Sequence, residues 1–236
     1  VCNLQVLLLS NNQIVSLNES IFEEMTELNV LKLDGNKLTG LPVGLFEIVT
    51  KLEQLFLSVN QIVSLNESIF EKTTELKALE LDYNNLTGLP VCLFETLTKL
   101  KILFLNDNQI VSLNESIFDK MTELNVLWLH RNKLTGLPDG VFHKLDNLIY
   151  LDLHGNQLYS LQSNQFKFLA NLNILNIKRN GLKTLPKGVF NELTNFNHLD
   201  LSENELVALP NDLLNGLINL HTLKLNNNKL ISLPKN

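Results

Sequence analysis

The residues Leu124 to Leu134, LNVLWLHRNKL, set the pattern that the rest of the chain copies. Their apolar frame is Leu124, Leu127, Leu129 and Leu134, with Asn132 between the last two leucines. The frame returns every 24 residues, starting at Leu4, Leu28, Leu52, Leu76, Leu100, Leu124, Leu148, Leu172, Phe196 and Leu220. The asparagine returns with it at Asn12, Asn36, Asn60, Asn84, Asn108, Asn132, Asn156, Asn180, Asn204 and Asn228. Ten copies in register predict one repeat protein rather than several globular domains.

The spacing of the frame predicts a short strand followed by a turn. Successive side chains of an extended segment point to opposite faces, so Leu127 and Leu129 point inward. Val126, Trp128 and His130 then point outward and are free to vary. In the turn that follows, the asparagine amide can both donate and accept hydrogen bonds with backbone groups that need partners.

The remainder of each repeat is long enough for the crossover that parallel neighbouring strands require. This return segment carries a second apolar column, which we expect to be buried and which Leu214 closes: Phe22, Phe46, Phe70, Phe94, Phe118, Phe142, Phe166 and Phe190. We therefore predict an α/β fold, a single right-handed horseshoe-shaped solenoid over residues 1–236. Its parallel β-sheet lies on the concave face, and turns and short helical pieces lie on the convex face.

Composition and cysteine content exclude several classes of partner. A net charge of −6 argues against nucleic acid or an anionic membrane as the ligand. No run approaches the ~20 apolar residues of a membrane span, so we expect no membrane insertion by this segment. Cys2 and Cys92 are too far apart in the predicted stack to pair and are expected to be free thiols, unless Cys2 pairs with a cap outside this chain. The end repeats carry no cap, which predicts a segment of a longer protein or a homo-oligomer formed through the ends.

The first six repeats contain a 48-residue pair present three times, and its copies differ mainly on the outward face. The fifth position of the even repeats, for example, reads Lys32, Glu80 and Trp128, whereas the return segments are almost fixed. A surface that changes while its frame is copied is typical of a recognition face, although relaxed constraint on exposed positions produces a weaker form of the same pattern.

The return segments of the odd repeats contain two overlapping motifs. Ser20, Ser68 and Ser116 precede an acidic residue by three positions, which resembles a capping box and predicts that a helical turn begins there. The same segments contain acceptor triplets for N-glycosylation, and a fourth follows in an even repeat, so the candidate glycosylation sites are Asn18, Asn66, Asn85 and Asn114. Occupied triplets would mean a secreted chain; the alternative is that they only cap turns.

Catalytic chemistry is not indicated. His130, His154 and Asp152 occupy neighbouring outward positions and could hold a metal ion, but histidines on a variable polar face need none. We therefore predict no metal and no cofactor. No motif places a serine or cysteine beside a histidine, and we predict that the chain is not an enzyme.

The large outward side chains instead form a contiguous exposed patch suited to an interface: Phe56, Tyr83, Phe104, Trp128, His130, Arg131 and Tyr150. The alternative is that Phe56 and Phe104 only pack along the sheet and bind nothing.

The repeat is the leucine-rich repeat, and its 24-residue form resembles the typical extracellular repeats of Toll-like receptors, Slit proteins and variable lymphocyte receptors. The segments LPDGVF (137–142) and LPKGVF (185–190) are particularly similar to those of variable lymphocyte receptors. The resemblance implies a ligand held by variable strand positions of the concave face: Lys32, Phe56, Glu80, Asp82, Tyr83, Phe104, Asp107, Trp128, His130, Arg131, Tyr150, Asp152, His154 and Asn176. The chain departs from that family in its 48-residue duplication and in lacking disulfide-bonded caps.

These observations predict an extracellular recognition module, secreted or on a cell surface, that binds a protein or glycan ligand and is immune or receptor-like in role. Two alternatives remain: a structural or adhesive module that self-associates, and an intracellular protein-interaction scaffold.

Overall fold

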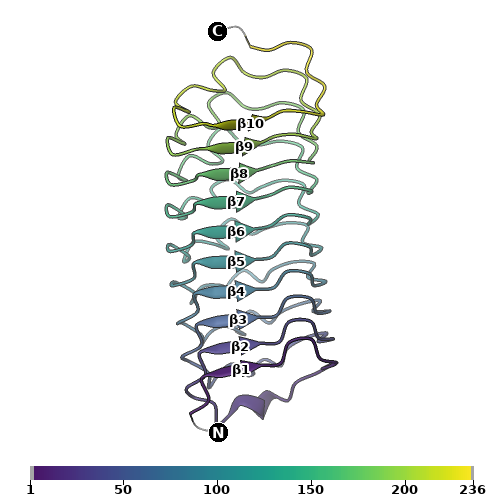
Figure 1. Ribbon diagram of the computed structural model, residues 1–236, viewed down its shortest axis with the longest axis vertical. Coiled ribbons are helices and arrows are strands. Elements are labelled where there is room, and N and C mark those ends of the chain that lie inside the picture. The colour runs from purple at the N-terminus through teal and green to yellow at the C-terminus, as the bar shows by residue number, and fades with distance from the viewer. Residues whose placement is uncertain (1–2, 235–236) are drawn as a thin grey trace.

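The structure is a computed structural model that describes residues 3–234 as one column of stacked repeats (Figure 1). Its ten strands form a single sheet in sequence order, and each strand pairs in parallel with the next. The strands are β1 (Val6–Leu8), β2 (Val30–Lys32), β3 (Gln54–Phe56), β4 (Ala78–Glu80), β5 (Ile102–Phe104), β6 (Val126–Trp128), β7 (Tyr150–Asp152), β8 (Ile174–Asn176), β9 (His198–Asp200) and β10 (Thr222–Lys224). The predicted solenoid and its period are confirmed.

The alternation of the strand side chains is also as predicted. In β6, Leu127 is fully buried, Leu129 beyond it is equally buried, and Val126, Trp128 and His130 are partly exposed. We call the side of the sheet that carries these outward residues the sheet face; it is the side that the sequence predicts to be concave. Each strand residue pairs with the residue 24 positions further on, so equivalent outward side chains lie side by side.

The asparagines form a ladder along the turns. Asn132 Nδ2 donates to the carbonyl oxygens of Leu105 (2.9 Å) and Leu129 (3.1 Å), and Asn132 Oδ1 accepts from the backbone N–H of Ile110 (2.9 Å). Each interior asparagine thus joins its own turn to the preceding repeat, which satisfies buried backbone groups that the strand leaves unpaired.

The phenylalanines form a second buried column. Their rings stack between neighbouring repeats with centroids 5.9–6.4 Å apart, as in the pairs Phe22–Phe46 and Phe166–Phe190. The prediction that Leu214 closes this column is wrong, because Leu214 is 53% exposed and Leu213 is the buried residue. No later return segment within residues 3–234 covers Leu214, whereas Leu213 occupies a position that is buried in the earlier repeats as well, as at Val141 and Val189.

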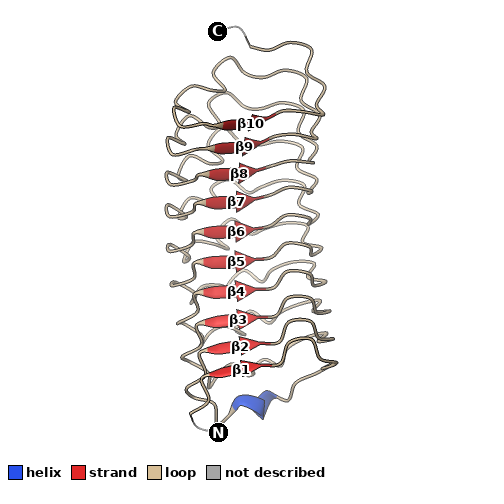
Figure 2. Cartoon of the chain, viewed as in Figure 1, coloured by secondary structure: helices blue, strands red, loops and turns tan. Residues whose placement is uncertain are grey.

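The return segments are mostly turns, and the described residues contain one short helix, the 3-10 helix η1 (Glu19–Phe22), drawn in blue in Figure 2. The predicted capping boxes are wrong. Asn18 Oδ1, not the serine hydroxyl, accepts the N–H of Ser20 (2.9 Å), and Asn66 and Asn114 accept those of Ser68 and Ser116 in the same way. An asparagine amide reaches the N–H two residues on without strain, which places the start of the turn two residues earlier.

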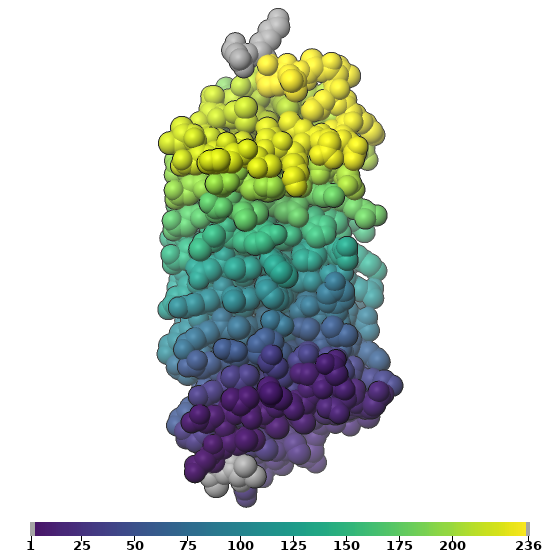
Figure 3. Space-filling model, in the orientation of Figure 1, coloured from purple at the N-terminus to yellow at the C-terminus, as the bar shows by residue number. Residues whose placement is uncertain are grey.

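The repeats form successive layers from one end of the molecule to the other (Figure 3). The frame leucines of the outermost repeats are less buried than their interior equivalents; Leu7 and Leu223 are partly buried, whereas Leu31 and Leu199 are fully buried. Cys92 is a free, exposed thiol, while Cys2 lies outside the described residues. Within residues 3–234, no helix has the length and hydropathy that crossing a bilayer requires.

A candidate binding face on the sheet

The sheet register brings seven of the predicted ligand-binding residues into one row. Each is the last residue of its strand, and each pairs with the next across β2 to β8: Lys32, Phe56, Glu80, Phe104, Trp128, Asp152 and Asn176. Equivalent side chains on adjacent strands are roughly 4.8 Å apart, so the row is a continuous strip.

Three predicted residues lie beside the strip rather than on it. Tyr83, Asp107 and Arg131 occupy the turn after their strands, with φ values of 50°, 51° and 50°. This left-handed conformation recurs once per repeat and turns the side chain toward the edge of the sheet face. Asp82, His130 and His154, by contrast, precede this turn position and share the outward direction of the strip.

Aromatic rings form the middle of the strip. Phe104 and Trp128 stack with centroids 4.1 Å apart and planes 12° apart, and Tyr150 meets Trp128 edge-on at 6.0 Å. Further toward the N-terminus, Lys32 Nζ lies 4.4 Å from the centre of the Phe56 ring. The rings therefore do pack along the sheet, as the alternative interpretation proposed, but Phe56, Phe104 and Trp128 all remain partly exposed.

Asp152 is the centre of a hydrogen-bond network beside the rings. The residue is only 4% exposed, and its carboxylate accepts from His154 Nδ1 (2.8 Å), from Asn176 Nδ2 (3.2 Å) and from the Tyr150 hydroxyl (3.3 Å). Burial disfavours the charged form, but the hydrogen bonds from the side chain and backbone of His154 hold the pKa of Asp152 below its ordinary value. The same burial, together with the charge of Asp152, raises the pKa of Tyr150 to about 12. Asp152 thus positions its neighbours instead of offering itself to a ligand.

His130 lies between two carboxylates. Its ring stacks on His154 with centroids 4.4 Å apart, and its Nε2 and Nδ1 atoms are 3.6 Å from Asp107 Oδ2 and 3.7 Å from Asp152 Oδ2. Burial lowers the pKa of His130 despite these carboxylates.

Ligand atoms of His130, Asp152 and His154 all lie within 4.8 Å of one another, which raises the question of a metal site. The two imidazole planes differ by only 14° and the ring centroids are 4.4 Å apart, so the in-plane lone pairs of the two rings lie in separate, nearly parallel planes. A tetrahedral ion requires lone pairs that converge on one point. This arrangement favours the hydrogen-bond network over metal binding.

The N-terminal half of the face is acidic. Ser58 Oγ donates to Asp82 Oδ1 (2.6 Å) and lies 3.3 Å from Glu80 Oε2. Burial raises the pKa of both carboxyls, and the charge of Asp82 raises that of Glu80 further. The sheet face therefore changes from acidic to aromatic and then to histidine-rich along the stack.

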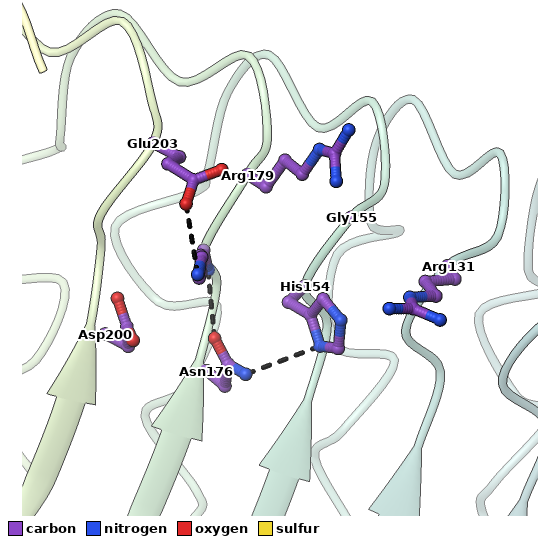
Figure 4. A pocket seen from close by; sticks show the side chains of 8 residues that line it. Arg131, His154, Gly155, Asn176, Arg179, Asp200 and Glu203 are labelled. Atoms are coloured by element: carbon purple, nitrogen blue, oxygen red, sulfur yellow. Dashed lines mark hydrogen bonds and ion pairs between the residues drawn. The ribbon is translucent and has the colours of Figure 1, made fainter. Parts of the chain in front are cut away.

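Beyond His154 the face contains a hollow of about 640 Å³ (Figure 4). Its lining consists of Arg131, His154, Gly155, Asn176, Lys178, Arg179, Asp200 and Glu203. Three of these residues were among the predicted binding positions. Arg179, Lys178, Asp200 and Glu203 were not, although the 24-residue register places Arg179 two repeats beyond Arg131 and could have identified it.

The candidate glycosylation sites lie away from the strands. Asn18, Asn66 and Asn85 are exposed and Asn114 is partly exposed. In Asn66 and Asn114 the amide oxygen also accepts the hydroxyl of the serine two residues on, at 2.7 Å and 2.8 Å. In the described part of the chain, the amide nitrogens of Asn66 and Asn114, the atoms that a glycan modifies, donate no hydrogen bond.

Comparisons with known proteins agree on the fold. The leucine rich repeat family model matches residues 2–62, 50–110, 74–134, 122–182 and 170–230. No curated protein sequence matches the chain.

Several solved structures superimpose on almost the whole chain. The TLR13–ssRNA13 complex matches with a TM-score of 0.87 and 30% identity over 95% of this chain and 33% of that chain. A leucine-rich repeat protein of Leptospira interrogans matches with a TM-score of 0.81 and 32% identity, over 99% of this chain and 63% of that chain. The Toll–Spatzle complex of Drosophila matches with a TM-score of 0.80 and 28% identity, over 97% of this chain and 36% of that chain. This chain thus spans between one third and two thirds of those proteins, and it belongs to the leucine-rich repeat family.

Proposed function

We propose that the chain is an extracellular recognition module that binds a protein or glycan ligand on its sheet face by surface complementarity. The observation that carries the proposal is the fixed aromatic cluster of Phe104, Trp128 and Tyr150 beside the Asp152 network. Aromatic side chains held by neighbours bind with little loss of conformational entropy and dominate many interfaces. The Toll and TLR13 structures each contain a bound macromolecule, which supports a binding role for this fold.

The test compares a double variant of the aromatic stack with a matched control. Phe104→Ala with Trp128→Ala removes the stack, and Val43→Ala with Val91→Ala removes two exposed side chains from the return segments. Each protein is screened against an array of glycans and a panel of secreted proteins. We expect ligands of the unaltered chain to be retained by the control and lost by the stack variant. Equal retention by both variants contradicts the proposal.

Folding of the variants needs a separate measurement, because the two rings also stabilise each other. A stacked aromatic pair contributes about 0.5–1.5 kcal/mol beyond its burial. Far-UV circular dichroism and thermal denaturation then show whether lost binding reflects an altered surface or an unfolded chain.

Location outside the cell is tested through the glycosylation sites. Expression through the secretory pathway of a mammalian cell is expected to add glycans to Asn18, Asn66, Asn85 and Asn114, because these side chains are accessible. Mass spectrometry before and after enzymatic removal of the glycans measures occupancy. Four unmodified sites would support the intracellular scaffold instead.

A further inference from the structure

We propose that the hollow between Arg131 and Arg179 binds the carboxylate of an acidic sugar at the end of a glycan. The inference rests on the proposed function, because it names the ligand class of the same face. Figure 4 shows the two arginines on either side of Gly155, with His154 between them.

Gly155 creates the hollow. It occupies the left-handed turn position (φ 63°) at which the repeats on either side carry Arg131 (φ 50°) and Arg179 (φ 53°). A Cβ atom at Gly155 would lie 3.3 Å from Arg131 Cγ, so a side chain there would fill the space. Two strand spacings separate the arginines by roughly 10 Å, a distance that two side chains reaching inward can close around one small group.

The charges of the hollow leave the arginines available. Its acidic residues are already paired with lysines, Glu203 with Lys178 (3.0 Å) and Asp200 with Lys224 (3.5 Å). Arg131 makes a single long contact with Asp107 (3.4 Å), in the repeat on the side away from the hollow.

Arg179 has no ion-pair partner among residues 3–234. The chain contains only two arginines, and both line this hollow. Two guanidinium groups without a carboxylate between them repel each other, and a bound anion would relieve that repulsion.

The remaining lining suits a sugar. A volume of about 640 Å³ is far larger than one carboxylate and falls in the range of small-ligand sites. His154 supplies Nε2, because its Nδ1 is hydrogen-bonded to Asp152. Asn176 already donates to Asp152 and accepts from the backbone N–H of Lys178, and supplies its second amide N–H. Polar groups of this kind match sugar hydroxyls, while a guanidinium fork matches a carboxylate.

A polyanion fits the face poorly. The acidic half, with Asp34, Glu80 and Asp82, lies on the same sheet face, and the whole chain carries a net charge of −6. A nucleic acid or sulfated polysaccharide along the strip would meet these charges, whereas a single carboxylate in the hollow would not.

The test is a titration of the full chain with defined sugars. Binding is measured by isothermal titration calorimetry, and the titration is repeated at several salt concentrations. The probes are 3′-sialyllactose and a disaccharide ending in glucuronic acid, with lactose as the neutral control and heparin and single-stranded polyuridine as polyanions. We expect at least one acidic sugar to bind and lactose not to bind. Higher salt should weaken the binding.

Three variants locate the binding. Arg179→Gln is expected to weaken it roughly ten- to hundredfold, the loss of one charge-assisted hydrogen-bonding group. Gly155→Tyr is expected to abolish it by filling the hollow without adding a charge, and should fold because Tyr83 adopts this backbone conformation at the equivalent turn position. Lys144→Gln, which removes an exposed cation from a return segment, should leave the affinity unchanged.

The outcomes separate this inference from the proposed function. Acidic sugars that bind no better than lactose overturn the inference, as does binding that survives both Arg179→Gln and Gly155→Tyr. Tighter, Arg179-dependent binding of heparin or polyuridine also overturns it, in favour of a polyanion. If a ligand from the array depends on Phe104 and Trp128 but not on Arg179, the recognition face stands and the acidic sugar fails.

Discussion

Replacing Asn132 with alanine tests the idea that the asparagine ladder holds the repeats together. The change leaves the buried N–H of Ile110 without an acceptor, at a cost of about 1–3 kcal/mol. The carbonyls of Leu105 and Leu129 lose less, because each also accepts from a neighbouring asparagine, Asn108 (3.2 Å) or Asn156 (3.0 Å). Each of those two lost bonds contributes about 0.5–1.5 kcal/mol. Together these losses are expected to lower the free energy of unfolding of Asn132→Ala by about 4 kcal/mol.

Asn12 provides a matched control in the first repeat. It occupies the equivalent turn of the first repeat and donates to the carbonyls of Leu9 (3.0 Å) and Ser10 (3.3 Å). Because Asn12 is exposed, water can hydrogen-bond to these carbonyls when the side chain is removed. Asn12→Ala should cost about 0.5 kcal/mol. Urea denaturation followed by circular dichroism, and by the fluorescence of Trp128, the single tryptophan, measures both values. Equal losses for the two variants would refute the ladder argument, provided that the two probes report coincident transitions.

Three further predictions concern titration and packing. Burial lowers the pKa of His130, so protons bind preferentially to the unfolded chain. Stability should therefore fall as the pH drops below the ordinary histidine pKa of ~6.5. The urea midpoint of His130→Gln should change less with pH over this range than that of the unaltered chain. The pKa of Tyr150 is about 12, so Tyr150→Phe should leave the tyrosinate absorbance change near pH ~10 intact, and a loss of amplitude there would contradict the buried phenol. Phe118→Ala should cost about 3–5 kcal/mol in urea denaturation, whereas the exposed Phe168→Ala should cost under about 1 kcal/mol; similar costs would mean that the phenylalanine column is not the core.

The fold follows from the sequence because the period itself specifies which residues are neighbours. A parallel strand every 24 residues places Leu127 beside Leu103 and Leu151, and a buried leucine in one repeat requires one in the next. The asparagine ladder is predictable for the same reason. Where the periodic neighbour is absent, as at Leu214, the prediction fails.

The site is less predictable, because its contacts depend on side-chain reach rather than on period. The register correctly places Asp152 on the outward face, yet three neighbours surround its carboxylate and bury it. Arg179 matters only because Gly155 lacks a side chain, a relation between two residues that no single repeat reveals. Likewise, the start of the helical turn at Asn18 depends on whether an amide or a hydroxyl reaches the N–H first.

The two halves of the sheet face differ in how freely they can change. The backbone of each strand is paired on both sides and each turn is held by its asparagine, so an outward residue such as Lys32 or Glu80 has little role in folding. Near Asp152 this freedom ends, since loss of His154 would leave a buried carboxylate short of its strongest hydrogen bond. The duplicated repeats can therefore vary the ligand contacts, while the histidine network next to the hollow must stay fixed. A ligand that contacts both parts would be anchored by the fixed network and selected by the variable strip.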